Sequence, residues 1–357
     1  MNMSAIEHGV IGLITLIIII GAFLWVRRDA IRYRRLIGIT TVVTFVLIIL
    51  GAYVRLSDAG LGCPDWPGCY GNLTPHHSAA EIRAAEAVQP DGVVTMAKAW
   101  KEMAHRYLAM VVGALIAAIL FAAVRNRRGF AQSPLLPVVI AMAVIFQAAL
   151  GAWTVTMLLK PAIVTAHLLG GVILLGLLAW LLARQPGSGK MGARIIAPSG
   201  VKIFAIAAAV VLFAQIVLGG WVSTNYAALA CTDLPTCHGQ WLPAMDFANA
   251  FHIIRPLGVG PDGALLTIEA LRAIHWLHRL GAIVVVLVVG AFAWRMMKIN
   301  AGHKAAKMLG VMLVLQIVLG LSNVWFKLPI VVAVAHNGLA ALMFAWMTMI
   351  VFRLHRA

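Results

Sequence analysis

The sequence holds an acid, an imidazole and a guanidinium within five consecutive positions, at Glu102, His105 and Arg106. They lie near the start of a long apolar segment, and residues three apart share one face of a helix. A lone histidine, His167, follows in a later apolar segment. Neutral imidazole is a good ligand for iron, and a carboxylate beside it can act as a general base or hold a developing charge. The pattern indicates a buried metal site with an acid at its edge.

A second version of the pattern comes later, with His278 and Arg279 as the adjacent pair and His336 as the lone histidine. His275 stands where the first version has Glu102, one helical turn before the candidate ligand. Only the first version therefore carries an acid at this place. The difference predicts that the first site is catalytic and that the second is a redox relay.

Each version supplies two histidines, and a haem iron with two axial imidazoles needs such a pair facing each other across a slot between helices. We expect His105 and His167 to form one pair, and His278 and His336 to form the other. The alternative is that each histidine only forms a hydrogen bond with a neighbouring helix. Because ionisable residues inside a membrane are costly, four histidines at matched places favour ligation.

The charged neighbours of the candidate ligands allow more than one interpretation. Glu102 is either the catalytic acid or an interfacial carboxylate that pairs with Lys98 or Arg106. Arg106 and Arg279 each follow a candidate ligand directly. They either bind haem propionates through charge-assisted hydrogen bonds or extend to the membrane interface.

Composition sets the class of protein that positions these residues. Of the 357 residues, 62% are hydrophobic and 11% are charged, and the mean hydropathy is +0.94. Soluble domains carry about 25% charged residues, so the chain is predicted to be an integral membrane protein. The formal net charge of +16 does not indicate nucleic acid. The basic residues cluster between apolar segments, as cytoplasmic flanks of membrane spans do.

The apolar segments predict an all-α integral membrane protein with about nine spans. They form two tandem four-helix bundles, related by a pseudo-two-fold axis along the membrane normal, plus one extra N-terminal transmembrane helix. Residues 1–35 hold the extra helix and a basic cytoplasmic loop, 36–184 the first unit, 185–202 a cytoplasmic linker and 203–357 the second unit. The positions of the basic clusters place the C-terminus in the cytoplasm. The expected spans are 10–26, 36–54, 95–124, 135–157, 163–183, 203–222, a helix carrying His275 and ending near residue 294, 308–326 and 330–352.

An internal repeat supports the two-unit arrangement. Residues 50–71 match 218–239 without a gap, and the segment Gln147–Gly151 matches Gln316–Gly320. Each unit has an even number of spans, so both enter the membrane in the same direction, which predicts the parallel type of repeat. Recurring small residues that only allow close helix packing are the alternative explanation.

Four cysteines form two pairs, Cys63 with Cys69 and Cys231 with Cys237, in loops expected outside the cell. Disulfides persist in such an oxidising compartment. Structural disulfide bonds are the favoured interpretation, beside a redox-active dithiol and a zinc site made from four thiolates. We expect no cleavable signal peptide and no amphipathic import sequence, which favours a bacterial inner membrane.

The sequence resembles the haem A synthase family from about Leu36 to the C-terminus. The resemblance is carried by the Glu102-x-x-His105-Arg106 run, the His278-Arg279 run, the Ala-His elements at His167 and His336 and the paired loop cysteines. The extra N-terminal helix departs from the eight-helix pattern of that family.

The resemblance implies an enzyme that converts haem O to haem A for terminal oxidases, oxidising a ring methyl to a formyl group by successive hydroxylations. His105 and His167 would then flank the substrate haem O, and Glu102 would take part in the oxidation. His278 and His336 would ligate a resident haem b that passes electrons. Haem O synthase, an unidentified electron donor and the lipid bilayer are the implied partners.

Two other functions are compatible with the histidine pattern. One is an electron-transfer cytochrome with two bis-histidine haems b and no chemistry on the porphyrin. The other is a transporter of haem or of a small solute, which requires a path to the inner face. No ionisable residue appears mid-span in the second half of these helices, so transport is the weaker alternative.

Overall fold

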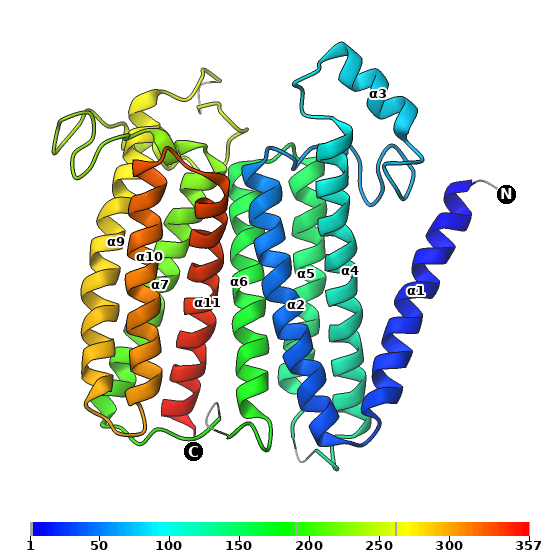
Figure 1. Cartoon of the computed structure of the whole chain (residues 1–357), viewed down its shortest axis with the longest axis vertical. Helices are drawn as coiled ribbons and strands as arrows, with labels where there is room; N and C mark the ends of the chain where they lie inside the picture. Colours follow the sequence, from blue (N-terminus) through cyan, green and yellow to red (C-terminus); the bar gives the residue numbers. More distant parts are fainter. Residues whose placement is uncertain (1–2, 131, 190–191, 261–262, 357) are drawn as a thin grey trace. The chain divides into compact units, whose positions relative to one another are not determined.

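A computed structural model describes residues 3–130, 132–189, 192–260 and 263–356, and the described chain is built from helices (Figure 1). Nine of the helices in these ranges are long and apolar enough to cross a membrane. The prediction of an all-α integral membrane protein is therefore confirmed. The long helices are α1 (Met3–Val26), α2 (Ala30–Leu56), α4 (Met96–Arg125), α5 (Leu135–Thr156), α6 (Pro161–Arg184), α7 (Ser199–Thr224), α9 (Ile268–Met297), α10 (His303–Trp325) and α11 (Ile330–His355).

Several helices begin at residues whose side chains cap the first turn. Thr95 caps α4 as expected, because its side chain accepts a hydrogen bond from the backbone N–H of Lys98. Thr267 caps α9 in the same way through Ala270. Several helices extend beyond the apolar segments that predict them. α2 begins at Ala30 rather than near residue 36, because the Asp29 carboxylate caps its first turn.

The chain divides into two compact units. The first comprises Met1–Leu158 and Leu177–Gly189, and the second comprises Leu159–Gly176 and Lys190–Ala357. Helix α6 is thus divided: its residues up to Gly176 belong to the second unit, and those from Leu177 onward belong to the first. The expected linker, 185–202, includes Lys190 and Met191, which lie outside the described residues.

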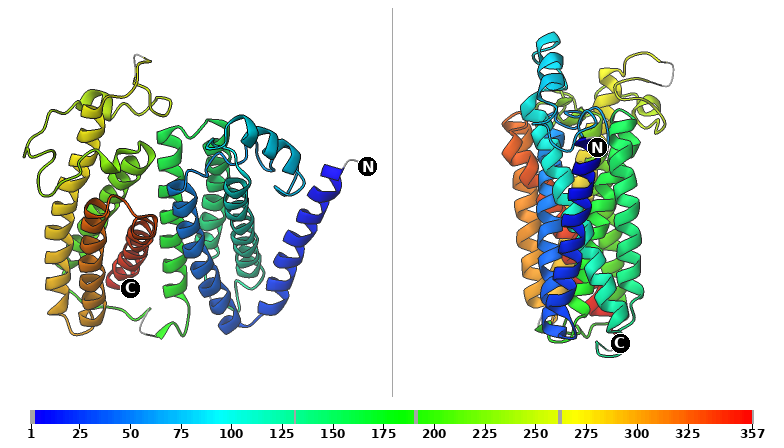
Figure 2. Two further views of the ribbon diagram at one scale, coloured as in Figure 1. Left: turned by 45° about the horizontal axis from the view of Figure 1, so that its top comes forward. Right: turned by 90° about the vertical axis from the view of Figure 1, so that its right-hand side faces the viewer.

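In the first unit, α4 packs against α1, α2 and α5 (Figure 2). The short helix α3 (Ala79–Val88) packs against α4. Helix α1 leaves most of its apolar side chains exposed, as suits a helix in contact with lipid. The central position of α4 is what buries Glu102 within the unit.

In the second unit, α7 and α10 each pack against both α9 and α11. α9 and α11 therefore occupy diagonal corners of a four-helix arrangement, and the candidate ligands His278 and His336 come from these two helices. This is the placement that two axial ligands of one metal require.

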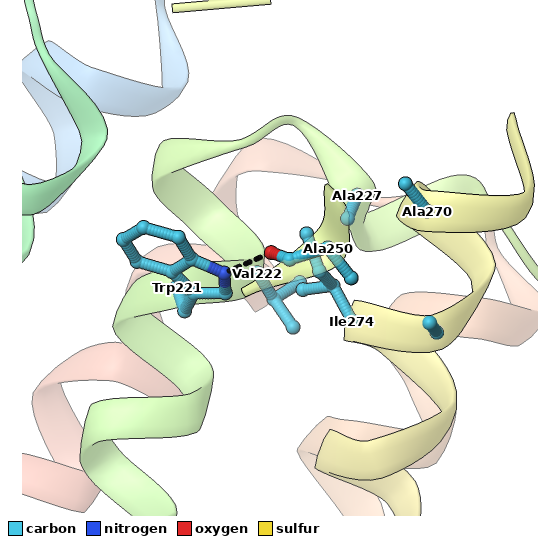
Figure 3. Packing of buried hydrophobic residues seen from close by; sticks show 7 residues of the cluster. Trp221, Val222, Ala227, Ala250, Ala270 and Ile274 are labelled. Atoms are coloured by element: carbon cyan, nitrogen blue, oxygen red, sulfur yellow. Dashed lines mark hydrogen bonds between the residues drawn. The ribbon is translucent and has the colours of Figure 1, made fainter. Parts of the chain in front are cut away.

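A small apolar cluster covers one end of the second unit (Figure 3). Val222 near the end of α7 lies beside Ile274 of α9, and the indole N–H of the neighbouring Trp221 donates a 2.9 Å hydrogen bond to the carbonyl of Ala250. Ala250 ends the short helix α8 (Phe247–Ala250). The cluster anchors the long loop that precedes α9 and so fixes the start of the helix that carries His275 and His278.

The sequence repeat extends to the backbone conformation of the loops. Tyr70 and His238, at matched positions, both have left-handed φ angles, of 52° and 53°. Each is followed by a glycine of positive φ, Gly71 or Gly239. Such φ values are uncommon for residues with a side chain, so their recurrence shows that both cysteine loops adopt one fold.

Candidate functional site

Glu102 lies in the second turn of α4 and is buried, with 4% of its surface exposed. One carboxylate oxygen, Oε2, accepts a hydrogen bond of 2.9 Å from the backbone N–H of Cys63. The other, Oε1, forms an ion pair with Arg106, one turn further along the helix. The interpretation of Glu102 as a carboxylate paired with Arg106 is thus correct as a description of its contacts. It does not exclude a catalytic role, since a buried carboxylate needs such donors in either case.

Arg106 links Glu102 to the first cysteine loop. Its Nη1 donates to the carbonyl oxygens of Asp65, at 2.8 Å, and Gly68, at 2.5 Å. Cys63 and Cys69 form a disulfide that closes this loop. The guanidinium therefore holds the disulfide loop and the buried carboxylate together through one rigid fork.

The second unit repeats this arrangement around an imidazole. Nδ1 of His275 lies 3.3 Å from the backbone N–H of Cys231, and its Nε2 lies 3.4 Å from Nε of Arg279. Arg279 also donates to the carbonyl oxygens of Cys231, Asp233 and Thr236, at 2.8 to 2.9 Å. Cys231 and Cys237 form the second disulfide.

These contacts define a socket in each unit, made of a cysteine N–H and an arginine that both point at one side chain. A carboxylate has two oxygens and can accept from both donors. A neutral imidazole has one acceptor nitrogen, so His275 can satisfy only one of the two donors. The socket of the first unit therefore suits an anion, and that of the second unit holds a poorer acceptor.

The turn inside each cysteine loop is held by an aspartate. Asp65 accepts from the backbone N–H groups of Tyr70 and Gly71 at 2.6 and 2.7 Å. Asp233 does the same for His238 and Gly239 at 2.6 and 2.9 Å. The Thr236 hydroxyl and these backbone donors lower the pKa of the Asp233 carboxyl below its usual range. A carboxylate that accepts several such bonds is strongly held in its ionised form.

His105, His278 and His336 each pack directly on a glycine of a neighbouring helix. A Cβ on Gly51 would lie 2.9 Å from Cε1 of His105, and one on Gly219 would lie 3.1 Å from Cε1 of His278. Gly320 and His336 repeat this contact at 3.1 Å. Any side chain at these glycines would push the imidazole aside, so the glycines fix where each ring lies.

The predicted site residues thus fall into two groups. The structure brings Glu102 and Arg106 together with the first cysteine loop, and it places His278 and His336 on diagonal helices of one unit. His167 lies in the part of α6 that belongs to the second unit. The pairing of His105 with His167 therefore stays a prediction.

All four cysteine sulfurs are in disulfide bonds. The prediction that each cysteine pair forms a disulfide bond is therefore confirmed. A zinc site of four thiolates is wrong for this structure, because a disulfide sulfur is not a thiolate ligand.

Sequence reasoning missed the role of the arginines in holding the cysteine loops. The signal is present in the repeat, because each arginine recurs together with a cysteine pair. It also missed Gln215, whose amide contacts His278. The segments Gln215–Gly219 and Gln316–Gly320 both read Gln-Ile-Val-Leu-Gly, and this identity was the available signal.

Comparison with known proteins assigns the chain to a family. The model of the COX15-CtaA family, described as cytochrome oxidase assembly protein, matches residues 34–348 and so includes every candidate site residue described above. The chain belongs to the COX15-CtaA family. The match begins after α1, in agreement with that helix being an addition to the common core.

Relatives within the family cover most of this chain. A protein named heme A synthase from Shewanella oneidensis is 42% identical over 309 residues, which are 86% of this chain and 92% of the relative. One of the same name from Halalkalibacterium halodurans is 27% identical over 333 residues, 91% of this chain and 98% of the relative. A third from Hyphomonas neptunium is 26% identical over 343 residues, 90% and 92% of the two chains.

Proposed function

We propose that this protein is a haem A synthase, a membrane enzyme that oxidises a ring methyl of haem O to a formyl group by successive hydroxylations. Family membership and the relatives named heme A synthase support the activity. The structural observation that carries the proposal is the buried carboxylate of Glu102, one helical turn from His105 in α4. The candidate ligand would hold the haem, and the acid would supply a proton acceptor beside its edge.

We assign the site around Glu102 and His105 to the substrate, and the site around His278 and His336 to a resident cofactor. His105 and His167 would be the axial ligands of haem O. His278 and His336 would hold haem b, and the second unit fits such a group. Its two imidazoles come from diagonal helices, and Nδ1 of His336 is buried with no hydrogen-bond partner among the described residues. When bound, haem b supplies one-electron redox chemistry.

The conversion of a methyl to a formyl group removes four electrons and adds one oxygen atom. Glu102 can take a proton from the reacting carbon or from a hydroxylated intermediate, since it lies on the face of α4 that also presents His105. Arg106 and the Cys63 N–H hold the carboxylate in one position. A pre-positioned base of this kind lowers the barrier without reorganisation of the site.

An electron-transfer cytochrome with two haems b is the alternative, and the relatives do not support it. Their name describes synthesis of a haem rather than transfer of electrons. The difference between the sockets also favours chemistry in one unit. An electron carrier gives no reason for a buried acid in the first unit and an imidazole at the same place in the second.

We propose the following setting for the enzyme. It lies in a bacterial inner membrane, with the cysteine loops outside and the C-terminus in the cytoplasm. Basic residues gather at the helix ends opposite the cysteine loops, including Arg125 in the last turn of α4 and Arg353 in the last turn of α11. Cytoplasmic flanks of spans are enriched in such residues. Haem O synthase and an electron donor are the expected partners.

The decisive experiment replaces Glu102 by Ala and analyses the pigments of the membranes by chromatography and mass spectrometry. We expect haem A formation to fall by at least about 100-fold, because a general base is lost. Haem O should remain bound. Glu102→Gln separates chemistry from architecture, because its amide oxygen can still accept from Cys63 while the charge is gone. It should be nearly as inactive as the alanine variant.

The matched control is Glu269→Ala. Glu269 is an acid in the first turn of α9 that pairs with Arg272 at 3.3 Å. Its replacement removes a carboxylate that lies outside the proposed catalytic site. It should leave haem A formation unchanged. Normal haem A output from Glu102→Gln would remove the carboxylate from the mechanism. Haem b as the sole pigment of the unsubstituted protein, with no haem O or hydroxylated product, would instead support the cytochrome alternative.

A further inference from the structure

In the second unit, each candidate haem ligand is contacted by a glutamine from a neighbouring helix. Nε2 of Gln215 on α7 donates to the backbone carbonyl of His278 at 2.9 Å and lies 3.0 Å from Nδ1 of its imidazole. Nε2 of Gln316 on α10 lies 3.1 Å from the backbone carbonyl of His336 and 3.4 Å from its ring Nε2. Both glutamines therefore contact a backbone carbonyl and an imidazole, but the ring nitrogen is Nδ1 for His278 and Nε2 for His336.

The glutamine and the glycine that contact one imidazole are four residues apart. Gln215 precedes Gly219, and Gln316 precedes Gly320. Residues at this spacing lie on the same face of a helix, one turn apart. The imidazole of His278 is therefore held by an amide at one turn and by bare backbone at the next.

Gly281, three residues after His278 on α9, leaves the space that the amide of Gln215 occupies. A Cβ at Gly281 would lie only 2.1 Å from Oε1 of Gln215. That oxygen is buried and has no hydrogen-bond partner within the described parts of the chain. A buried acceptor without a donor is costly, so an amide at this place needs a compensating role.

The first unit has a different pair of residues at the corresponding places. Leu47 lies four residues before Gly51, and Leu108 lies three residues after His105. Two leucines thus stand where the second unit has a glutamine and a glycine. The amide of Gln215 and the space left by Gly281 thus occur together in the second unit, and two leucines replace both in the first.

We propose that Gln215 is a positioning residue for His278, whose imidazole it holds in the orientation and tautomer that bind haem iron. A histidine that binds iron through Nε2 carries its proton on Nδ1 and needs an acceptor there. A half-turn of the Gln215 amide about its last bond exchanges its two ends. It gives up the hydrogen bond from Nε2 to the His278 carbonyl and presents Oε1 to the Nδ1 proton instead. The inference rests on the proposed function, because it requires that the second unit hold haem b.

The test uses the full-length purified protein with its haem, and it measures the midpoint potential of haem b and the rate of haem transfer to apomyoglobin. Gln215→Leu should raise the potential, because the iron ligand becomes less basic when its N–H loses an acceptor. Transfer should be at least about tenfold faster. Gln215→Glu offers a stronger acceptor and should lower the potential instead. A purely structural role for Gln215 would not produce opposite shifts in these two variants.

Two further variants sharpen the test. Gly281→Ala keeps Gln215 but displaces its amide, so it should reproduce the effect of Gln215→Leu and add little to it in the double variant. Gln185→Leu is the control, because Gln185 is also buried and hydrogen-bonded, to Gln132 and to the carbonyl of Leu181. It should leave the potential and the transfer rate unchanged.

The outcomes separate this inference from the function on which it rests. An unsubstituted protein without a bis-histidine haem spectrum would refute the proposed function itself. The inference would be overturned, and the proposed function left standing, by a different result. In that case the unsubstituted protein has the bis-histidine spectrum, and the Gln215 variants keep its midpoint potential and haem transfer rate. Should Gln215→Leu fail to fold, the Glu variant and Gly281→Ala decide by the same criteria.

Discussion

The sockets at Glu102 and His275 are built from the same parts and hold different chemical groups. In both, a cysteine backbone N–H and an arginine point at one side chain on the second or third turn of a long helix. The carboxylate can accept from both donors, and the neutral imidazole from one. The comparison teaches that one scaffold can hold a buried anion in one unit and a poorer hydrogen-bond acceptor in the other.

The largest expected effect comes from making the first socket like the second. Glu102→His should reduce haem A formation by at least about 100-fold, because the anion that the two donors stabilise is lost. The reverse change, His275→Glu, should leave haem A formation largely intact and lower the midpoint potential of haem b, since a nearby negative charge favours the ferric state. Pigment analysis and redox titration measure the two effects. Equal losses of haem A in both variants would show that the sockets do not differ in function.

The next effect concerns the arginines. Lysine carries a point charge and cannot bridge a carboxylate and several carbonyls as a guanidinium does. Arg106→Lys should therefore reduce haem A formation by roughly tenfold through misplacement of Glu102. Arg279→Lys should loosen the second cysteine loop with a much smaller effect on haem A. Turnover assays and hydrogen exchange of the loop amides check this, and a larger loss of haem A from Arg279→Lys would contradict it.

A smaller effect is expected when the first unit receives the amide of the second. The double variant Leu47→Gln with Leu108→Gly places a glutamine and the space for it beside His105. We expect slower release of haem from the first site and a modest fall in turnover, because a substrate site must exchange its haem at each cycle. Single-turnover and steady-state rates separate the two. Faster steady-state turnover would contradict this reasoning.

The smallest effect is a dependence of loop order on pH. The pKa of Asp233 lies below its ordinary value of 3.8. The ionised carboxylate therefore stabilises the loop above about pH 4, and this contribution is lost as the pH falls through the folded-state pKa. Hydrogen exchange of residues 231–239 should increase over that acidic range. Asp233→Asn should remove the dependence, and an unchanged acid response in that variant would assign it to another group.

The helices and the repeat were predictable because apolar segments and matched motifs leave strong signals. Thr95 as a cap and the Glu102–Arg106 pairing as one of two alternatives also follow from local spacing. The contacts between Arg106 and the loop carbonyls were not predictable. They join residues about forty positions apart, and backbone carbonyls have no identity in a sequence.

The glycine contacts were missed for a similar reason. Gly51, Gly219 and Gly320 resemble the small residues that let membrane helices approach, and that alternative explanation of the repeat accounts for them equally well. Only the positions of the imidazoles show what the missing side chains leave room for. The division of α6 between the two units was likewise not predictable. The apolar pattern marks a span, but it does not show to which unit each part of that span belongs.

The contacts of Arg106 and Arg279 also bear on the order of events during synthesis. Each cysteine loop emerges from the ribosome well before the arginine that later holds it, which follows 41 residues after Asp65 and 46 after Asp233. The sulfurs within each pair are separated by only six positions, so they can meet without that arginine. Oxidation of the two cysteines can therefore precede insertion of the helix that completes the socket. The nascent chain then carries a disulfide-closed loop before its arginine has been synthesised.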